Sequence, residues 1–299
     1  MTSFDNNEMN SMQIWLAAVR PRTLPAAASG VVMGSALAWR DGSFHWLPAL
    51  AALLIALLLQ IGSNLANDVY DFERGADTSA RHGPLRVTQA GLLSPAQVKR
   101  GMWIIFGLAA LLGLYLAFLR GWIVIALGLA AIISAIAYTG GPFPLGYYGL
   151  GDLFVFIFFG LAAVAGTYFA QAGFVSAAAW WMSAPIGLIV TAILVVNNLR
   201  DLENDRAAGK HTLAVMMGAR ATRVEYVLCI VVAYLLLPIL IFLRIIPVFA
   251  LSAWLSLPIA IMSTRIVFTQ QGRRLNAALA GTGQTALVYS LLFFLGIIL

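Results

Sequence analysis

The sequence predicts an all-α protein that crosses a membrane nine times, with its helices in one bundle around a central cavity and its N-terminus in the cytoplasm. Of its 299 residues, 61% are hydrophobic and only 10% are charged, and the mean hydropathy is +0.89. A soluble domain cannot bury so many apolar side chains. Helices are expected because a backbone in hydrocarbon must satisfy its own polar groups, and the apolar segments lack the two-residue alternation of a barrel strand.

Long stretches without Asp, Glu, Lys or Arg predict the individual helices. One crossing needs about 20 apolar residues, so the charge-free stretch 153–199 is long enough for two, with a turn near Gly173. Residues 1–19 precede the spans as a cytoplasmic segment, and residues 1–299 form one transmembrane domain. The nine expected spans are 23–39, 46–66, 102–119, 121–138, 152–170, 178–198, 225–243, 246–264 and 283–299.

The positions of the basic residues orient this bundle. With a cytoplasmic N-terminus, nine alternating crossings place 15 of the 18 Lys and Arg residues on the cytoplasmic side and only Arg40, Arg120 and Arg244 on the other. Cytoplasmic loops of membrane proteins carry such an excess. The net charge of +6 is thus explained by topology, and no nucleic-acid partner is expected. Cys229 is the single cysteine, which excludes an internal disulfide.

Seven of the twelve acidic residues lie in two segments that look like an internal repeat. Segment 64–78 reads NLANDVYDFERGADT, and segment 198–212 reads NLRDLENDRAAGKHT. At an offset of 134 residues the two share the pattern Asn-Leu-x-(Asn/Asp)-x-x-x-Asp-x-x-x-Gly-x-x-Thr. Each segment follows a predicted span, and four crossings separate them. Both are therefore expected to emerge on the cytoplasmic side, where they can face each other.

The spacing within each segment predicts a metal site. Polar residues three or four apart form a stripe on one face of a helix, and two opposed stripes are expected to crowd four or more carboxylates together. Such a concentration of like charge requires cations between the acids. Oxygen ligands without Cys or a supporting His favour Mg²⁺, especially beside phosphate. The expected ligands are Asn64, Asn67, Asp68, Asp71, Asp201 and Asp205, and the four aspartates among them are also the expected catalytic residues.

A solvated helix end is the alternative interpretation of an isolated Asp-x-x-x-Asp. The repetition, the shared side and the scarcity of acids elsewhere favour the metal site instead. Basic residues also interleave with the acids, and guanidinium groups bind phosphate in a bidentate manner. Anchoring by positive charge accounts for some of these residues but not for the interleaving. The residues expected to bind a diphosphate are Arg74, Arg81, Arg86, Arg200 and Lys210.

A polyprenyl diphosphate suits such a site, because its headgroup belongs on the metal and its tail belongs among apolar helices. Metal ions and cations there neutralise a leaving diphosphate. Five stretches then carry a resemblance to a known family: RPRTLPAA (20–27), NDVYDFERGADT (67–78), GPLR (83–86), YTGGPFPLGYYGLGD (138–152) and NNLRDLENDRAAGKHTL (197–213). Through these stretches the chain resembles the UbiA-type intramembrane aromatic prenyltransferases, and the resemblance covers essentially all nine spans. It is most similar to the members that act on 1,4-dihydroxy-2-naphthoate in menaquinone biosynthesis.

The resemblance implies a reaction and its location. A polyprenyl group is transferred from a polyprenyl diphosphate to the naphthoate with loss of diphosphate and CO₂, giving demethylmenaquinol. The enzyme is expected to be a multi-pass protein of the bacterial inner membrane, surrounded by membrane lipid, with its active site facing the cytoplasm. In the family two aspartate-rich motifs bind Mg²⁺-diphosphate. Gly75 stands where the first motif has its last Asp, and Asp77 follows two residues later.

Other residues are candidates for binding the aromatic acceptor. Arg22 is expected to pair with its carboxylate, and Tyr138 and Tyr148, which share a glycine-rich loop with Tyr147, are expected to stack on its rings or to stabilise a carbocation. Charge anchoring and an interfacial aromatic belt are the alternatives. We interpret Asp152 as the N-cap of its helix, in preference to a role in deprotonating a hydroxyl.

Three other functions stay open. The same chemistry can act on another aromatic acceptor, such as 4-hydroxybenzoate. A CDP-alcohol phosphotransferase also binds Mg²⁺ through aspartates, but its acids form one continuous motif, whereas here they form two distant copies. A transporter with internal repeats usually binds its substrate near the bilayer midplane on broken helices, whereas the charged residues here lie at the span ends.

Overall fold

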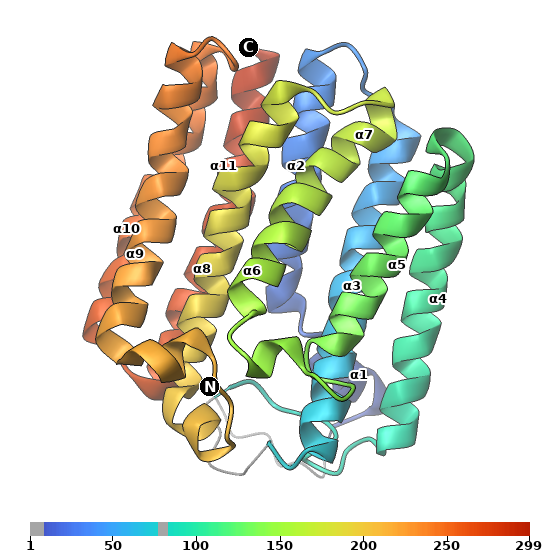
Figure 1. The fold of residues 1–299 in the computed structure, drawn as a ribbon, viewed down its shortest axis with the longest axis vertical. Helices are drawn as coiled ribbons and strands as arrows, with labels where there is room; N and C mark the ends of the chain where they lie inside the picture. Colours follow the sequence, from blue (N-terminus) through green and yellow to red (C-terminus); the bar gives the residue numbers. More distant parts are fainter. Residues whose placement is uncertain (1–8, 77–82) are drawn as a thin grey trace.

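The computed structural model describes residues 9–76 and 83–299, and this part of the chain contains helices and loops but no strand (Figure 1). The predicted all-α class is therefore confirmed. The first element, α1 (Ser11–Val19), lies in the segment that was expected only to precede the spans. It begins with a capping box, in which Asn10 and Gln13 each accept the backbone N–H of the other.

The remaining helices overlap all nine predicted spans. We call each helix, or each series of helices joined end to end, a rod. Within the described residues seven rods are long and apolar enough to cross a membrane, α5 is apolar but shorter, and α2 has 17 residues. The number of crossings stays a prediction. The rods are α2 (Leu24–Arg40), α3 (Trp46–Glu73), α4 (Pro95–Arg120), α5 (Trp122–Ala137), α6–η3–α7 (Gly151–Val155, Phe156–Ala165, Gly166–Ala172), α8 (Ala177–Ala207), α9 (Leu213–Phe242), η4–α10 (Val248–Ser256, Leu257–Thr269) and η5–α11 (Gly272–Leu275, Asn276–Ile298), and the short turns η1 (Pro21–Thr23) and η2 (Leu145–Tyr147) lie between them.

Side-chain caps explain where several helices begin. At the start of α4, Ser94 and Gln97 form a capping box, and Pro95 occupies the first turn, where no backbone N–H is needed. Ser176 caps α8 and Thr212 caps α9 by accepting a backbone N–H from the first turn. These boundaries thus follow from local sequence as well as from hydropathy.

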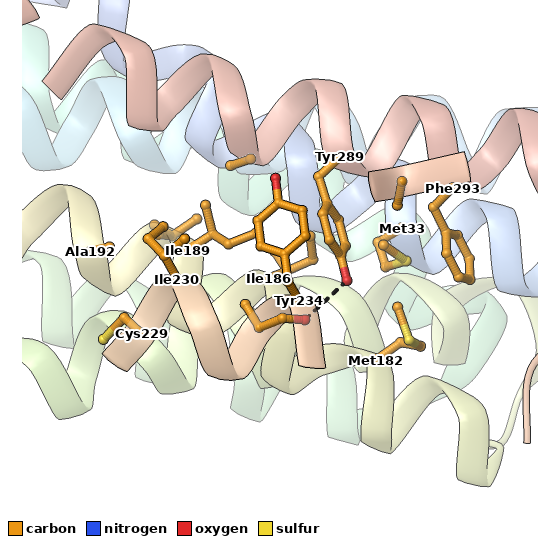
Figure 2. Close-up of a cluster of buried hydrophobic side chains, with 14 of the residues drawn as sticks. Met33, Met182, Ile186, Ile189, Ala192, Cys229, Ile230, Tyr234, Tyr289 and Phe293 are labelled. Carbon is orange, nitrogen blue, oxygen red and sulfur yellow. Dashed lines mark hydrogen bonds between the residues drawn. The ribbon is translucent and has the colours of Figure 1, made fainter. Parts of the chain in front are cut away.

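The helices pack into groups with separate buried cores. The largest core joins α2, α8, α9, α10 and α11, and Figure 2 shows its centre, where the rings of Tyr234 and Tyr289 meet edge to face with centroids 5.4 Å apart. A second core lies between α1, α3 and α4 and includes Leu65 and Phe106. The first core thus holds together α2, α8, α9, α10 and α11, and the second holds together α1, α3 and α4.

The rod α6–η3–α7 is fastened to α8 through small residues. A Cβ atom on Gly160 would lie 2.7 Å from the Cα atom of Gly187 and 2.7 Å from the carbonyl oxygen of Ser183. Such close approach is typical of helix packing in membranes.

The middle of this rod, η3, is a π-helix, a conformation that is frequent at functional sites.

A cavity of about 1490 Å³ lies among these helices, in agreement with the predicted central cavity. Its apolar walls include Gly128 of α5, Phe158 of η3 and Leu194 of α8. Its polar walls come from the ends of α3 and α8, which carry the two acidic segments. The cavity therefore has the polar and apolar parts that a lipid with a charged headgroup requires.

Candidate active site

The first acidic segment ends α3 in a Schellman motif. The N–H of Ala76 donates to the carbonyl of Asp71 at 3.0 Å, and the N–H of Gly75 donates to the carbonyl of Phe72 at 3.0 Å. This motif needs a left-handed residue, and Gly75 supplies it with a φ of 69°. The turn closes the helix directly beside Asp71.

The second acidic segment ends α8 in the same way. The N–H of Lys210 donates to the carbonyl of Asp205 at 2.9 Å, the N–H of Gly209 donates to Arg206 at 3.1 Å, and Gly209 has a φ of 71°. The offset of 134 residues thus relates the two helix ends in structure as well as in sequence. The motif also explains the position of Lys210, because it folds this residue back over Asp205.

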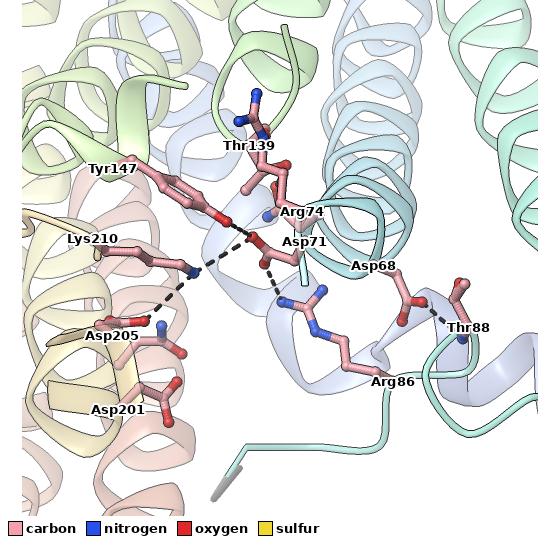
Figure 3. A network of polar contacts seen from close by, with 12 residues as sticks. Asp68, Asp71, Arg74, Arg86, Thr88, Thr139, Tyr147, Asp201, Asp205 and Lys210 are labelled. Carbon is pink, nitrogen blue, oxygen red and sulfur yellow. Dashed lines mark hydrogen bonds and ion pairs between the residues drawn. The ribbon is translucent and has the colours of Figure 1, made fainter. Parts of the chain in front are cut away.

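Lys210 joins the two helix ends, as Figure 3 shows. Its Nζ atom lies 3.5 Å from Oδ1 of Asp71 and 3.5 Å from Oδ1 of Asp205. All three side chains line the cavity. The two acidic segments therefore converge, as the sequence predicts.

Asp71 is the centre of this polar network. Its Oδ1 accepts the hydroxyl of Tyr147 at 2.8 Å, and its Oδ2 accepts Nη2 of Arg86 at 2.9 Å. Only 3% of Asp71 and 5% of Arg86 is exposed. A carboxylate buried to this extent needs such cationic partners to stay ionised.

Arg200 plays a similar part on α8. Its Nε donates to Oδ1 of Asp201 at 2.9 Å, its Nη1 donates to Asn276 of α11 at 2.8 Å, and its Nη2 donates to Asn197 at 2.8 Å. Both members of the Arg200–Asp201 pair are buried and line the cavity. The pair thus holds a positive and a negative group at the wall of the cavity.

These cations correct the expected arrangement of the acids. In residues 9–76 and 83–299 no three His, Cys, Asp or Glu side chains lie close enough together to hold a metal. The expectation of four or more crowded carboxylates is wrong, because Lys210, Arg86 and Arg200 lie among the acids and neutralise them. The donor set still fits Mg²⁺, since the polar wall offers carboxylate and amide oxygens from two helices. The donors that line the cavity are Asn67, Asp71, Asn197, Asp201, Asn204 and Asp205.

Asp68 lies apart from this donor set. It is completely buried, its Oδ1 accepts the N–H of Thr88 at 3.0 Å, its Oδ2 accepts the N–H of Val87 at 3.1 Å, and Arg20 lies 3.6 Å away. It does not line the cavity. The structure thus places this predicted ligand under the loop that carries Arg86, where it fastens the loop to α3.

Asn64 lines the cavity, but its amide group is engaged elsewhere. Its Nδ2 donates to the carbonyl of Val19 and to Oγ1 of Thr23, both at 2.9 Å, and its Oδ1 accepts Nε2 of Gln60 at 3.2 Å. The side chain therefore holds the connection between α1 and α2 against α3. Asn67, one turn further on, lines the cavity and accepts Oγ1 of Thr139 at 3.1 Å.

The predicted diphosphate-binding residues divide into two sets. Arg86, Arg200 and Lys210 line the cavity. Arg74 does not, and instead donates to the carbonyls of Thr139 and Gly141, the loop that follows α5. Arg81, like Asp77, lies outside the described residues.

The tyrosines of the glycine-rich loop also differ in position. Tyr138 lines the cavity, as predicted for an acceptor site, whereas Tyr148 is 49% exposed, stacks on Phe143 and does not line the cavity. Tyr147 takes the inner position instead, and Nζ of Lys210 lies 4.6 Å from the centre of its ring. Sequence reasoning singled out the loop but had no signal to choose among its tyrosines.

Two arginines line the cavity from connecting segments. Arg22, the predicted partner of an acceptor carboxylate, projects from η1, and Arg273 projects from η5. Arg273 was not singled out from the sequence, where it was one basic residue among several in a cytoplasmic loop. Both guanidinium groups can meet an anion in the cavity.

Asp152 lies at the start of α6, near Tyr138 but outside the cavity lining. The N-cap of α6 is Leu150, and no side chain caps this helix. The interpretation of Asp152 as a cap is therefore wrong.

The geometry of the site agrees with the known proteins that this chain resembles in sequence and in fold. It is 38% identical to the 1,4-dihydroxy-2-naphthoate octaprenyltransferase of Escherichia coli, covering 98% of this chain and 97% of that protein, and 40% identical to the enzyme of the same name from Mycobacterium tuberculosis, covering 95% and 96%. The fold resembles that of a UbiA homologue from Aeropyrum pernix, with a TM-score of 0.67 at 16% identity over 94% of this chain and 96% of that one.

A second structure with this fold is a UbiA homologue from Archaeoglobus fulgidus bound to DMAPP and Mg²⁺, with a TM-score of 0.62 at 16% identity, covering 95% of this chain and 99% of that one. The sequence model of the UbiA prenyltransferase family matches residues 27–297. This match spans both acidic segments and nearly every helix described above. The chain therefore belongs to the UbiA prenyltransferase family.

Proposed function

We propose that the protein transfers a polyprenyl group from a polyprenyl diphosphate to 1,4-dihydroxy-2-naphthoate, with loss of diphosphate and CO₂, and so makes demethylmenaquinol. The observation that carries the proposal is the convergence of two acidic helix ends, with Arg86, Arg200 and Lys210 among them, at the polar wall of a large, mostly apolar cavity. Relatives that are 38% and 40% identical over nearly the whole chain carry the name of this activity.

In this proposal the polar wall binds the diphosphate. Mg²⁺ ions would be held by Asn67 and Asp71 at the end of α3 and by Asp201 and Asp205 at the end of α8, and would supply positive charge that stabilises a leaving diphosphate. Lys210 is well placed to change partners, because its Nζ atom lies at the edge of hydrogen-bond range, 3.5 Å from each carboxylate. A phosphate oxygen can therefore replace either carboxylate as the partner of this ammonium group.

The apolar part of the cavity binds the prenyl tail and the ring of the acceptor. Arg22 and Arg273 line the cavity and offer positive charge to the acceptor's carboxylate, while Tyr138 offers a ring and a hydroxyl. The long apolar helices support a location of this cavity within a membrane. We propose nine crossings of the bacterial inner membrane, with the acidic segments at the cytoplasmic face.

A direct assay tests the proposal. Purified protein in lipid nanodiscs is incubated with Mg²⁺, a polyprenyl diphosphate and 1,4-dihydroxy-2-naphthoate, and the prenylated product, CO₂ and diphosphate are measured. All three are expected in equal amounts. A parallel reaction with 4-hydroxybenzoate tests the alternative acceptor, and product from it alone would replace the acceptor while retaining the transferase.

A membrane transporter is the alternative from another class. It predicts substrate flux into proteoliposomes and no release of diphosphate in the same assay. Flux without diphosphate release would reject the transferase.

A further inference from the structure

Asp152 is a buried acid that the proposed binding of the diphosphate does not use. Only 9% of the residue is exposed, and its Oδ1 atom is buried without a hydrogen-bond partner among the described residues. It lies in the first turn of α6, whose N-cap is Leu150. A polar atom is rarely left unpaired in a protein interior, and an acid at the edge of a membrane span is by default a candidate for function.

Tyr138 lines the cavity and also lies beside the start of α6, next to Asp152. Asp152 itself does not line the cavity. The hydroxyl lies against the backbone next to Asp152, because a Cβ atom on Gly151 would be 2.8 Å from the Tyr138 oxygen. Gly151 therefore allows this phenol to approach the start of α6, where Asp152 is the next residue along the chain.

Within the part of the chain that the structure describes, the other titratable groups near Asp152 are on α9. They are Glu225 and Cys229, and neither is a cation. The carboxyl group of Asp152 thus differs from those of Asp71, Asp201 and Asp205, which are paired with Arg or Lys. An unpaired acid in such surroundings is suited to accept a proton rather than to bind a metal.

We propose that Tyr138 and Asp152 form the proton-transfer pair of the reaction. Tyr138 contacts the acceptor, and Asp152 is the base that accepts the proton from Tyr138 and later returns it. This inference rests on the proposed function. The ring hydroxyl next to the acceptor's carboxylate gives its proton to the oxygen of Tyr138, and Tyr138 gives its own proton to Asp152. The electron pair of the broken O–H bond stays on the acceptor oxygen and activates the neighbouring carbon.

The remaining bond changes balance without a further reagent. The activated carbon, which bears the carboxylate, forms a C–C bond to the prenyl group, and the prenyl C–O bond breaks with its electron pair leaving on diphosphate. The product is a β-keto carboxylate. Its bond to CO₂ breaks, the electron pair restores the aromatic phenolate, and the proton returns from Asp152 through Tyr138. One proton is lent and returned, so none is consumed or released.

The variants Asp152→Asn and Tyr138→Phe test this pair at saturating concentrations of both substrates. Each is expected to lower kcat by about 100-fold or more, which is the usual contribution of acid–base catalysis. The KM for the prenyl diphosphate is expected to change by less than about threefold, because neither residue carries the charge that binds it. The double variant is expected to be no slower than the slower single variant, since the two residues act as a unit.

A fluorinated acceptor whose ring hydroxyl ionises more readily separates proton transfer from a structural role. With it the loss in Asp152→Asn is expected to shrink at least tenfold, because less help is then needed to remove the proton. The matched control is Asp41→Asn, which removes the charge from a different acid, the one that accepts the hydroxyl of Tyr168 at 2.6 Å. It is expected to keep wild-type kcat.

The outcomes are distinguishable. A wild-type enzyme that makes no product from the naphthoate would reject the proposed function and this step with it. If the wild type makes product but Asp152→Asn keeps its kcat, or loses the same factor with both acceptors, only the proton-transfer pair is overturned. Gly151→Ala gives an independent reading, because its Cβ atom would displace the Tyr138 hydroxyl and is expected to lower kcat without removing a titratable group.

Discussion

At the scale of single residues, Asp68 and Asp71 lie one helical turn apart on α3 but face different surroundings. Asp71 lines the cavity among Tyr147, Arg86 and Lys210, whereas Asp68 accepts two backbone N–H groups of the loop that carries Arg86. Asp71→Asn is expected to lower turnover by about 100-fold or more, because it removes charge from the site where diphosphate and metal bind. The measurement is kcat as a function of Mg²⁺ concentration.

Asp68→Asn serves as the comparison. It weakens charge-assisted hydrogen bonds and is expected to cost about 1 to 3 kcal/mol of stability, seen as a lower Tm in detergent. The Mg²⁺ concentration for half-maximal activity is expected to stay unchanged. A large increase in that concentration would show instead that Asp68 binds the metal, as its place in the sequence motif predicts.

Tyr147 and Tyr148 provide a second matched pair of neighbours. Tyr147→Phe removes the 2.8 Å hydrogen bond to Asp71 but leaves the ring beside Lys210. Because a hydrogen bond to a charged group contributes about 1.5 to 3 kcal/mol, turnover is expected to fall by roughly 10- to 100-fold. Tyr148→Phe changes an exposed hydroxyl and is expected to have no effect on kcat. Equal losses in both variants would contradict the assignment of Tyr147 to the site.

The sequence predicts much of the site at this scale because spacing on a helix determines which residues share a face. Asp71, Asp201 and Asp205 line the cavity as expected, and so does Lys210, one of the basic residues interleaved with the acids. Asp68 could not be separated from Asp71 in advance, because the loop at Val87 and Thr88 decides which carboxylate is covered. Tertiary contacts of this kind leave no periodic signal.

At the scale of elements, hydropathy predicts the rods because each apolar stretch must be helical in hydrocarbon. It does not predict α1, which is short and depends on its capping box, nor does it predict the π-helical middle of the rod that follows Asp152. Both depend on packing against neighbouring helices. The contact of η3 with α8 is one such packing feature, and it is open to a direct test.

Gly160→Ala is expected to destabilise the protein at that contact. Its Cβ atom would lie 2.7 Å from Gly187 and from the carbonyl of Ser183, and such overpacking costs about 1 to 3 kcal/mol. Thermal unfolding in detergent should therefore begin several degrees lower. Gly166→Ala is the control, because no atom lies within 4 Å of its Cβ position. A Tm for Gly160→Ala at or above that of the control would contradict tight packing at this contact.

At the scale of the whole molecule, the positions of the basic residues and of the helix ends predict how the bundle is oriented in the membrane. Ser43 lies between α2 and α3, and Arg40 beside it donates to the carbonyl of Ile245, at the end of the bundle where the loop after α9 lies. Gln271 lies between α10 and η5, close to Asn276, which accepts a hydrogen bond from Arg200 in the second acidic segment. Figure 1 shows these two connections at opposite ends of the bundle.

Single cysteines at these two positions test the orientation. In a Cys229→Ala background, Ser43→Cys is expected to react with a membrane-impermeant maleimide added to spheroplasts, and Gln271→Cys only after the membrane is inverted. The reason is that the predicted nine crossings would put 15 of the 18 Lys and Arg residues on the side of Gln271, which the positive-inside rule then assigns to the cytoplasm. Labelling of both positions from one side would reject the membrane crossing itself. The reversed pattern would place the acidic segments, and with them the proposed diphosphate site, on the outer face of the membrane and would overturn the predicted orientation.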